Sequence, residues 1–405
     1  MTLSDVCDLI IDCPHSTAKD EGYGYPLIRT PNIGKGRLIL DGVHRVSLET
    51  YNKRNQRAVP QEDDLILARE APVGNVAIIK NNQTVCLGQR TVLIRPNKEM
   101  VDSDYLVFYL LSPLMQHILL SSSNGATVNH LNMSAIRNLE ISLPRIDVQR
   151  KIGKILSEIA DKIEINEKIN RNLEEQAQTI FKEWFINNPL NEAWKRGTFS
   201  DVVVSTLGGD WGKDEEEGNY TEQVYCIRGA DIPEVKSGNM GKMPTRFILP
   251  KNLEAKRLMA GDVVIEISGG SPTQSTGRVA SISQSLLDRY DKELVCTNFC
   301  RALKPKVGFS MFVYYYWQYM YDKNVFFSYE NGTTGIKNLN IKGFLSNEEI
   351  IVPPVALVKE FDSFCHSIFD QIFKNGLATE KLSEIRDVLL PKLMAGELDV
   401  SDLNI

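Results

Sequence analysis

Apolar residues recur at helical spacing through one unusually long stretch, Pro144 to Phe185. They stand alternately four and three positions apart, which is typical of a coiled-coil seam rather than of the wider face of a globular helix. As one helix from Asp147 to Phe185, the stretch is roughly 58 Å long at about 1.5 Å per residue, more than a small domain measures across. We therefore expect the stripe to pack on a partner. Its apolar positions are Ile152, Leu156, Ile159, Ile163, Leu173, Ala177, Ile180 and Trp184.

The pattern before this helix returns in the second half of the chain at a nearly constant offset. ELVCTNFCRALKP corresponds to QTVCLGQRTVLIRP, SMFVYYYWQYM to DYLVFYLLSPLM, and NGTTGIKNLN to NGATVNHLN. A second helical run, Val355 to Met394, follows the second copy. Such a duplication predicts the order domain, long helix, domain, long helix. The predicted boundaries are 1–146, 147–188, 189–352 and 353–405.

Both seams turn polar near their centres, at Asn166 and Asn170 in the first helix and at Asn375 and Thr379 in the second. Polar seam residues lower stability but can fix register. We expect the two helices to pair antiparallel about a pseudo-twofold axis, with these residues facing one another. The alternative is that each helix packs only on its own domain.

Short apolar runs closed by glycine and proline predict strands in both domains. Apolar spacing predicts one helix over Asp104–Leu120. The aromatic run from Phe312 to Tyr319 is predicted to be a core helix rather than a base-stacking platform, because its counterpart YLVFYLL is largely aliphatic.

Composition is that of an ordinary water-exposed chain, with 42% hydrophobic and 24% charged residues. No run approaches a membrane span, and the N-terminus lacks a basic signal segment, so we expect a cytoplasmic protein without membrane contact. Seven cysteines without zinc-type spacing predict reduced thiols and no metal site. The net charge of −6 requires that any DNA-binding face be a local patch.

Two helix motifs carry a resemblance to a known family. QRKIGKILSEIADKIEINEKINRNLEEQAQTIFKEWF resembles the central conserved region of the specificity subunit of type I restriction-modification enzymes, and LLPKLMAGELDV resembles its distal conserved region. CPHSTAKDEGYGYPLIRTPNI, DLILAREAPVGNVAII and TLGGDWGK are similar to the more variable parts of its target recognition domains.

The resemblance implies an α+β fold, with two globular mixed α/β target recognition domains in a pseudo-twofold repeat, separated by two long antiparallel helices that form a coiled coil. It implies that each domain reads one half of a split site in double-stranded DNA. The helices then set the gap and dock two modification subunits, which methylate adenine at N6, and restriction/translocation subunits join the complex. S-adenosylmethionine, ATP and Mg are expected on those partner subunits and no cofactor in this chain.

Sequence motifs for catalysis are missing, so we expect no catalytic residues. The chain has no Walker-type lysine loop and no Asn/Asp-Pro-Pro-aromatic motif of an adenine methyltransferase. Asp262 and Glu266 stand four apart, but Ser268 occupies the position where a nuclease would carry a lysine.

Base reading needs Arg, Lys, Asn, Gln, Ser or Thr side chains on rigid supports. For any one candidate, the alternative is a solvated surface side chain or a structural partner of the fold. The first-domain candidates are Arg29, Asn32, Lys35, Arg37, Arg69, Gln89, Arg90, Thr127, Asn129 and His130. The second-domain candidates are Arg228, Ser268, Ser271, Thr273, Gln274, Arg278, Thr334 and Lys337.

The outer apolar surface of the helices is the predicted docking face for a modification subunit, with Phe181, Trp184, Leu389 and Leu393 as candidates. A different class of function stays open. The chain is alternatively a non-catalytic coiled-coil scaffold, or a decayed specificity subunit that no longer reads DNA.

Overall fold

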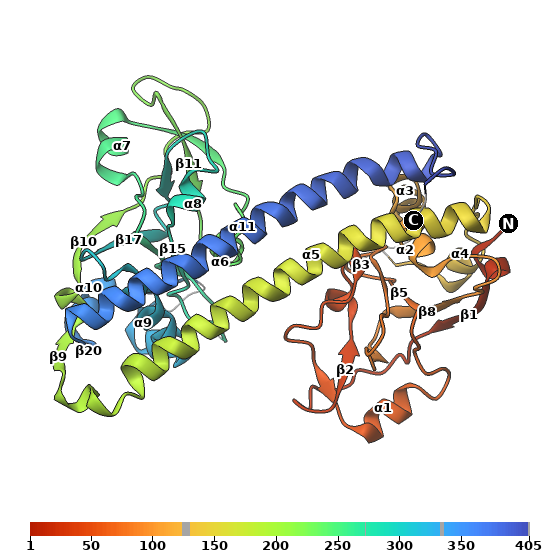
Figure 1. Cartoon of the computed structure of the whole chain (residues 1–405), viewed down its shortest axis with the longest axis horizontal. Coiled ribbons are helices and arrows are strands. Elements are labelled where there is room, and N and C mark those ends of the chain that lie inside the picture. Colours follow the sequence, from red (N-terminus) through yellow and green to blue (C-terminus); the bar gives the residue numbers. More distant parts are fainter. Residues whose placement is uncertain (124–129, 272, 333–335, 404–405) are drawn as a thin grey trace. The chain divides into compact units, whose positions relative to one another are not determined.

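Two long helices run through both halves of the fold in the computed structural model, which describes residues 1–123, 130–271, 273–332 and 336–403 (Figure 1). They are α5 (Ile146–Phe181) and α11 (Val355–Met394), close to the two predicted helices. The chain divides into unit 1, Met1–Glu164 with Lys381–Ile405, and unit 2, Ile165–Glu380. Each long helix therefore contributes one segment to each unit.

The core of unit 1 is a five-stranded sheet in the order β1-β8-β5-β6-β3, beside a small sheet β4-β2-β7. In β5, Leu65 and Leu67 face the core that holds helix α2, and Ile66 and Ala68 face a second core. Because both faces are covered, the strand is apolar throughout. The elements are η1 (Leu3–Val6), β1 (Cys7–Asp12), β2 (Tyr25–Ile28), η2 (Thr30–Asn32), β3 (Gly36–Arg37), β4 (Arg45–Val46), α1 (Leu48–Arg54), β5 (Leu65–Ala68), β6 (Val76–Ile78), β7 (Cys86–Leu87), β8 (Thr91–Pro96), α2 (Ser103–Leu111), α3 (Pro113–Ser121) and α4 (Met133–Arg137).

The single helix predicted over Asp104–Leu120 is wrong, because the structure has two helices there, α2 and α3. Proline disfavours helical geometry in the residue before it, and Ser112 is extended, with φ −61° and ψ 149°. The Ser112 hydroxyl accepts a hydrogen bond from the backbone N–H of Met115 and so caps the second helix.

Unit 2 repeats the topology of unit 1, which confirms the predicted duplication. Its main sheet, β10-β17-β13-β15, matches β1-β8-β5-β6, and its small sheet β12-β11-β16 matches β4-β2-β7. In each small sheet the central strand pairs antiparallel with one neighbour and parallel with the other. Even a register shift recurs, after Cys7 in β1 and after Val203 in β10.

Helix α9 covers the sheet of unit 2 in the way that α2 covers that of unit 1, and its aromatic residues Tyr314, Tyr315 and Trp317 are buried. The predicted core helix is thereby confirmed. The elements are η3 (Lys182–Ile186), η4 (Pro189–Ala193), β9 (Lys195–Thr198), η5 (Phe199–Asp201), β10 (Val203–Gly208), β11 (Glu222–Ile227), α6 (Ile232–Lys236), β12 (Thr245–Ile248), α7 (Pro250–Lys256), β13 (Val263–Glu266), β14 (Ser268–Gly269), β15 (Val279–Ser281), α8 (Gln284–Leu287), β16 (Leu294–Cys296), β17 (Cys300–Pro305), α9 (Ser310–Asp322), η6 (Val325–Tyr329), β18 (Glu330–Asn331), β19 (Lys337–Leu339), α10 (Ile341–Asn347) and β20 (Glu349–Val352).

Within each unit the two long helices share a core. In unit 1, Ile152 near the start of α5 belongs to the same core as Leu393 near the end of α11. In unit 2, the rings of Phe181, at the end of α5, and Phe361, near the start of α11, lie 5.9 Å apart. Both observations require antiparallel helices. The alternative in which each helix packs only on its own domain is wrong.

Asn170 of the first seam and Asn375 of the second meet as predicted within unit 2, whereas the buried Nδ2 of Asn166 has no hydrogen-bond partner among the described residues. Asn375 donates its Nδ2 to Oδ1 of Asn170 over 2.8 Å. The Nδ2 of Asn170 in turn donates to the backbone oxygens of Ile372 (2.9 Å) and Ser237 (3.0 Å). This buried amide is therefore satisfied at both ends, and it joins both helices to the loop after α6.

Gly376 allows α11 to approach that loop closely. A Cβ at position 376 would lie 2.0 Å from the backbone oxygen of Gly238, a contact that no side chain can make. Among the described residues, no helix is long and apolar enough to cross a membrane.

Candidate nucleic-acid interface

Four of the first-domain candidates meet at one end of the main sheet of unit 1, where β1 and β5 end and β8 begins. Arg69, directly after β5, is buried, and all three nitrogens of its guanidinium form hydrogen bonds within the fold. It donates to the backbone oxygen of Leu131 (2.8 Å), to Oδ2 of Asp12 (2.6 Å) and to Nε2 of His130 (2.7 Å). Arg69 is therefore a support for its neighbours rather than an exposed reader.

His130 and Glu70 continue this network toward the surface. Arginine only donates, so Nε2 of His130 must accept, and its Nδ1 donates to Oε1 of Glu70 over 2.8 Å. The other carboxylate oxygen of Glu70 lies 2.7 Å from Nε of Arg90. The chain Arg69–His130–Glu70–Arg90 thus alternates donors and acceptors from the interior to the solvent.

Arg90 is the exposed end of the network, with 57% of its side chain accessible and a left-handed backbone, φ 65°. Gln89 beside it donates to the backbone oxygen of His15 (2.8 Å) and accepts from the hydroxyl of Thr17 (3.0 Å). Arg57 donates to the backbone oxygen of Asp12 (3.3 Å), so a second exposed cation adjoins the same strand end.

The remaining first-domain candidates are used differently. Asn32 is buried, and its amide bonds the backbone at Arg29 and Ile39. Arg37 is buried against α5, where it donates to Asp161 (2.8 Å) and to the hydroxyl of Ser157 (2.7 Å). Both side chains are buried and are held by these bonds within the fold.

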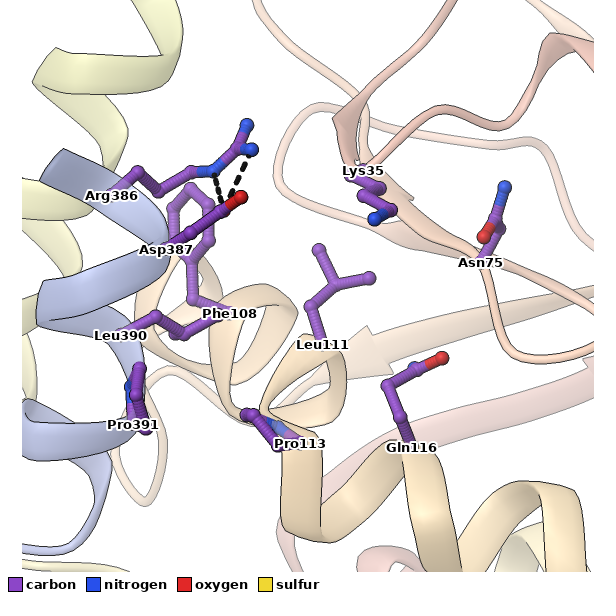
Figure 2. Close-up of a pocket in the computed structure, with 10 residues that line it drawn as sticks. All are labelled: Lys35, Asn75, Phe108, Leu111, Pro113, Gln116, Arg386, Asp387, Leu390 and Pro391. Atoms are coloured by element: carbon purple, nitrogen blue, oxygen red, sulfur yellow. Dashed lines mark hydrogen bonds and ion pairs between the residues drawn. The ribbon is translucent and has the colours of Figure 1, made fainter. Parts of the chain in front are cut away.

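Lys35 is exposed and lies on the wall of a pocket formed by α2, α3, α11 and the residues before β3 and β6 (Figure 2). The pocket also holds the ion pair of Arg386 with Asp387, over an apolar floor that includes Phe108 and Leu390. Arg29 is half-buried. Thr127 and Asn129 lie outside the described residues.

Several cationic candidates of unit 2 are paired with carboxylates of their own unit. Nε of Arg228 lies 2.9 Å from Asp231, and Arg278 makes two bonds to Glu266, at 2.6 and 2.8 Å. Hydrogen bonds to these carboxylates raise the pKa of both guanidinium groups. Both guanidinium groups are thus held by carboxylates close to them in sequence, in a geometry that also stabilises the fold.

The loop after β13 holds most of the other candidates. Lys337 pairs with Glu330 at 2.8 Å, and Ser268 bonds Asn338 across the strands β14 and β19. Ser271 accepts from the backbone N–H groups of Thr273 (3.3 Å) and Gln274 (3.0 Å), which forms a turn. Thr334 lies outside the described residues.

The docking candidates on the helices are mostly covered by the fold. Phe181 is fully buried among aromatic rings, and Leu393 is buried in the core of unit 1. Trp184 and Leu389 are half-buried against the same cores. The prediction of an outer apolar face is wrong for Phe181 and Leu393, because the seam faces the domains as well as the partner helix. The exposed large apolar residues of the two long helices are Ile165, Ile169, Val355, Phe364, Leu377, Ile385 and Val388.

Two exposed aromatic residues of unit 2 escaped the sequence analysis. Phe299, directly before β17, is 59% exposed, and Trp211, after β10, is 39% exposed and stacks on Arg246 at 4.2 Å. Phe299 falls opposite Arg90 when ELVCTNFCRALKP and QTVCLGQRTVLIRP are aligned from their final prolines. This correspondence is the sequence signal from which Phe299 could have been identified.

Comparison with known proteins assigns this architecture. Residues 1–175 match the family model of the type I restriction modification DNA specificity domain. The chain is 28% identical over 421 residues to a type I restriction enzyme specificity subunit, MjaIX, of Methanocaldococcus jannaschii, covering 97% of this chain and 88% of the relative. It is 23% identical over 408 residues to the HindI specificity subunit of Haemophilus influenzae, covering 85% of this chain and 88% of that one.

A solved structure shares the fold. The S subunit of a type I restriction-modification system from M. genitalium aligns with a TM-score of 0.57 at 14% identity, covering 97% of this chain and 95% of that chain. Sequence likeness along nearly the whole chain thus agrees with the duplicated architecture. Residues 1–175 thus match the DNA specificity domain of type I restriction-modification systems, and nearly the whole chain is similar to the specificity subunits of those systems.

Proposed function

We propose that this chain reads a bipartite site in double-stranded DNA, one half with each domain. The observation that carries the proposal is the repeat: two domains of one topology present different side chains at the same end of the sheet. Because those side chains differ, the two half-sites differ in sequence. The exposed cations beside the strand ends, Arg57 and Arg90, supply part of the contact to phosphate and bases.

The long helices act as the spacer and as the docking surface for two modification subunits. Their exposed apolar residues, which include Ile165 and Ile169 on α5 and Ile385 and Val388 on α11, are suited to burial against a partner. The modification subunits carry S-adenosylmethionine and methylate adenine at N6. Restriction/translocation subunits use ATP and Mg. This chain contributes sequence choice and geometry, and the reacting groups lie on its partners.

The net charge of −6 sets an expectation for binding. Outside a local patch the chain repels DNA, so the isolated chain binds weakly and the complex binds more strongly. A gel shift with and without the modification subunit measures this difference, and repetition at several salt concentrations counts the phosphate contacts from the slope.

Single-molecule real-time sequencing of a host that expresses this chain with its modification subunit tests the proposal. The expected result is one new N6-methyladenine motif, made of two short different sequences around a fixed number of unspecified base pairs. A complex that assembles but leaves no bipartite motif refutes the proposal and favours a scaffold or a decayed subunit.

A further inference from the structure

We propose that Arg90 and Phe299 are equivalent specificity-determining residues, which read the two half-sites by opposite chemistry. The first domain offers a guanidinium that hydrogen-bonds base edges, and the second offers an apolar ring that contacts a thymine methyl group or a base step. This inference rests on the proposed function and adds to it the residues that make the half-sites different.

Backbone hydrogen bonds establish that the two positions are equivalent. The N–H of Arg69 donates to the oxygen of Arg90 over 2.9 Å, and the N–H of Ile267 donates to the oxygen of Phe299 over 2.9 Å. Two residues earlier in each turn, Gly88 N–H donates to Ile28 oxygen (2.7 Å), and the second domain repeats the bond. The repeated bond joins Thr297 N–H to Ile227 oxygen at 3.0 Å.

The neighbouring strand pair is repeated as well. Glu70 bridges to His130 in unit 1, and Ser268 pairs with Asn338 in unit 2. In unit 1 the N–H of Leu131, which follows His130, donates to the oxygen of Arg69, which precedes Glu70. In unit 2 the N–H of Leu339, which follows Asn338, donates to the oxygen of Ile267, which precedes Ser268. Arg90 and Phe299, which we call the two tips, therefore each lie beside the same kind of strand pair, which we call the support. Of the two tips, only Arg90 has a positive φ.

The side chains on this shared frame differ in kind. In unit 1 the support is charged: Glu70 holds Arg90 on one side and His130 on the other. In unit 2 the support is neutral, because Ser268 donates its hydroxyl to the amide oxygen of Asn338. One tip is thus a guanidinium aimed by a carboxylate, and the other is a phenyl ring that is 59% exposed.

Base chemistry assigns a role to each tip. Guanine presents two acceptors, O6 and N7, in the major groove, and arginine is the side chain that most often bonds both. Thymine presents a methyl group there, which apolar side chains contact, and phenylalanine also wedges between base steps in the minor groove. A single exposed phenylalanine is common on protein surfaces. Its place at the tip equivalent to Arg90 is what distinguishes this one.

Two alanine variants and two matched controls test the inference in the assembled complex. The variants are Arg90→Ala and Phe299→Ala. Lys98→Ala is the control for the first, because Lys98 follows β8 at its other end and is likewise an exposed ion-paired cation, 69% accessible and 2.6 Å from Asp63. Val307→Ala is the control for the second, because Val307 follows β17 and is 92% exposed.

The readout is the methylated motif from real-time sequencing, with co-purification of the modification subunit as the check on assembly. Arg90→Ala is expected to relax one base of one half-site, and Phe299→Ala one base of the other. Discrimination at that base should fall about 5- to 150-fold, which corresponds to about 1–3 kcal/mol. The conservative variant Phe299→Leu is expected to keep much of the preference, and both controls the full motif.

The outcomes separate this inference from the proposed function. If the wild-type complex yields a bipartite motif that both alanine variants keep unchanged, the inference is overturned and the proposed function stands. Relaxation of the same half-site by both variants also overturns it. If the assembled wild-type complex yields no bipartite motif, the proposed function fails first.

Discussion

Asn170 offers the sharpest test of how the two helices are held together. The change to alanine removes three hydrogen bonds, one with Asn375 and two to the backbone oxygens of Ile372 and Ser237. Each bond is worth about 0.5–1.5 kcal/mol net, and buried partners left unsatisfied cost more. We therefore expect the free energy of unfolding of unit 2 to fall by about 2–4 kcal/mol.

The chain provides its own probe for this experiment. Its four tryptophans, Trp184, Trp194, Trp211 and Trp317, all belong to unit 2, so tryptophan fluorescence during urea unfolding reports that unit alone. Asn172→Ala, on the exposed face of the same helix, is the control and should change the free energy of unfolding by less than about 0.5 kcal/mol.

A double-mutant cycle isolates the contact between the two asparagines. Only one of the three bonds joins Asn170 to Asn375, so the coupling energy between Asn170→Ala and Asn375→Ala should be about 1 kcal/mol. If Asn170→Ala costs no more than the Asn172→Ala control, or if the cycle shows no coupling, these hydrogen bonds do not hold the seam together and the reasoning is refuted.

Three further variants probe other parts of the fold. Arg37→Ala should lower the free energy of unfolding of unit 1 by about 2 kcal/mol because its bonds to α5 are lost, whereas Lys35→Ala, an exposed neighbour, should not; thermal unfolding followed by circular dichroism compares them. Phe181→Ala, at a fully buried ring, should cost about 3–5 kcal/mol by the fluorescence assay, and a loss below about 1 kcal/mol contradicts the tight packing of that ring. The hydrogen bond to Asp362 raises the pKa of His366, so its stabilisation is present below the ordinary histidine pKa and lost as pH rises through the raised value. The gap in melting temperature between the wild type and His366→Gln should be wider at pH 6 than at pH 8, and a gap independent of pH rules this out.

The sequence predicted the helices well because their signal is periodic and local. Val355–Met394 has the predicted bounds, and the antiparallel partner followed from the repeat. The one helix that failed was broken by Pro113, whose effect on Ser112 outweighed the continuing apolar spacing.

The site was predictable only in part, because the partners of charged residues lie far away in sequence. Arg37 meets Asp161 and Arg69 meets Asp12, contacts that no local pattern announces. The sequence therefore identified several polar residues that lie at the end of the sheet, but not which of them form hydrogen bonds inside the fold. Phe299 was missed for the opposite reason, since an apolar residue beside a strand reads as core.

The close contact between Gly376 and Gly238 fixes the position of α11 along its axis against the loop after α6. A slide of α11 by one residue would drive the side chain of Asn375 or Leu377 into the backbone oxygen of Gly238, where not even a methyl group fits. Insertions and deletions between the start of α11 and Gly376 would bring such a side chain to the position that Gly376 occupies against Gly238. Within α11, changes in helix length are thus confined to the residues after Gly376.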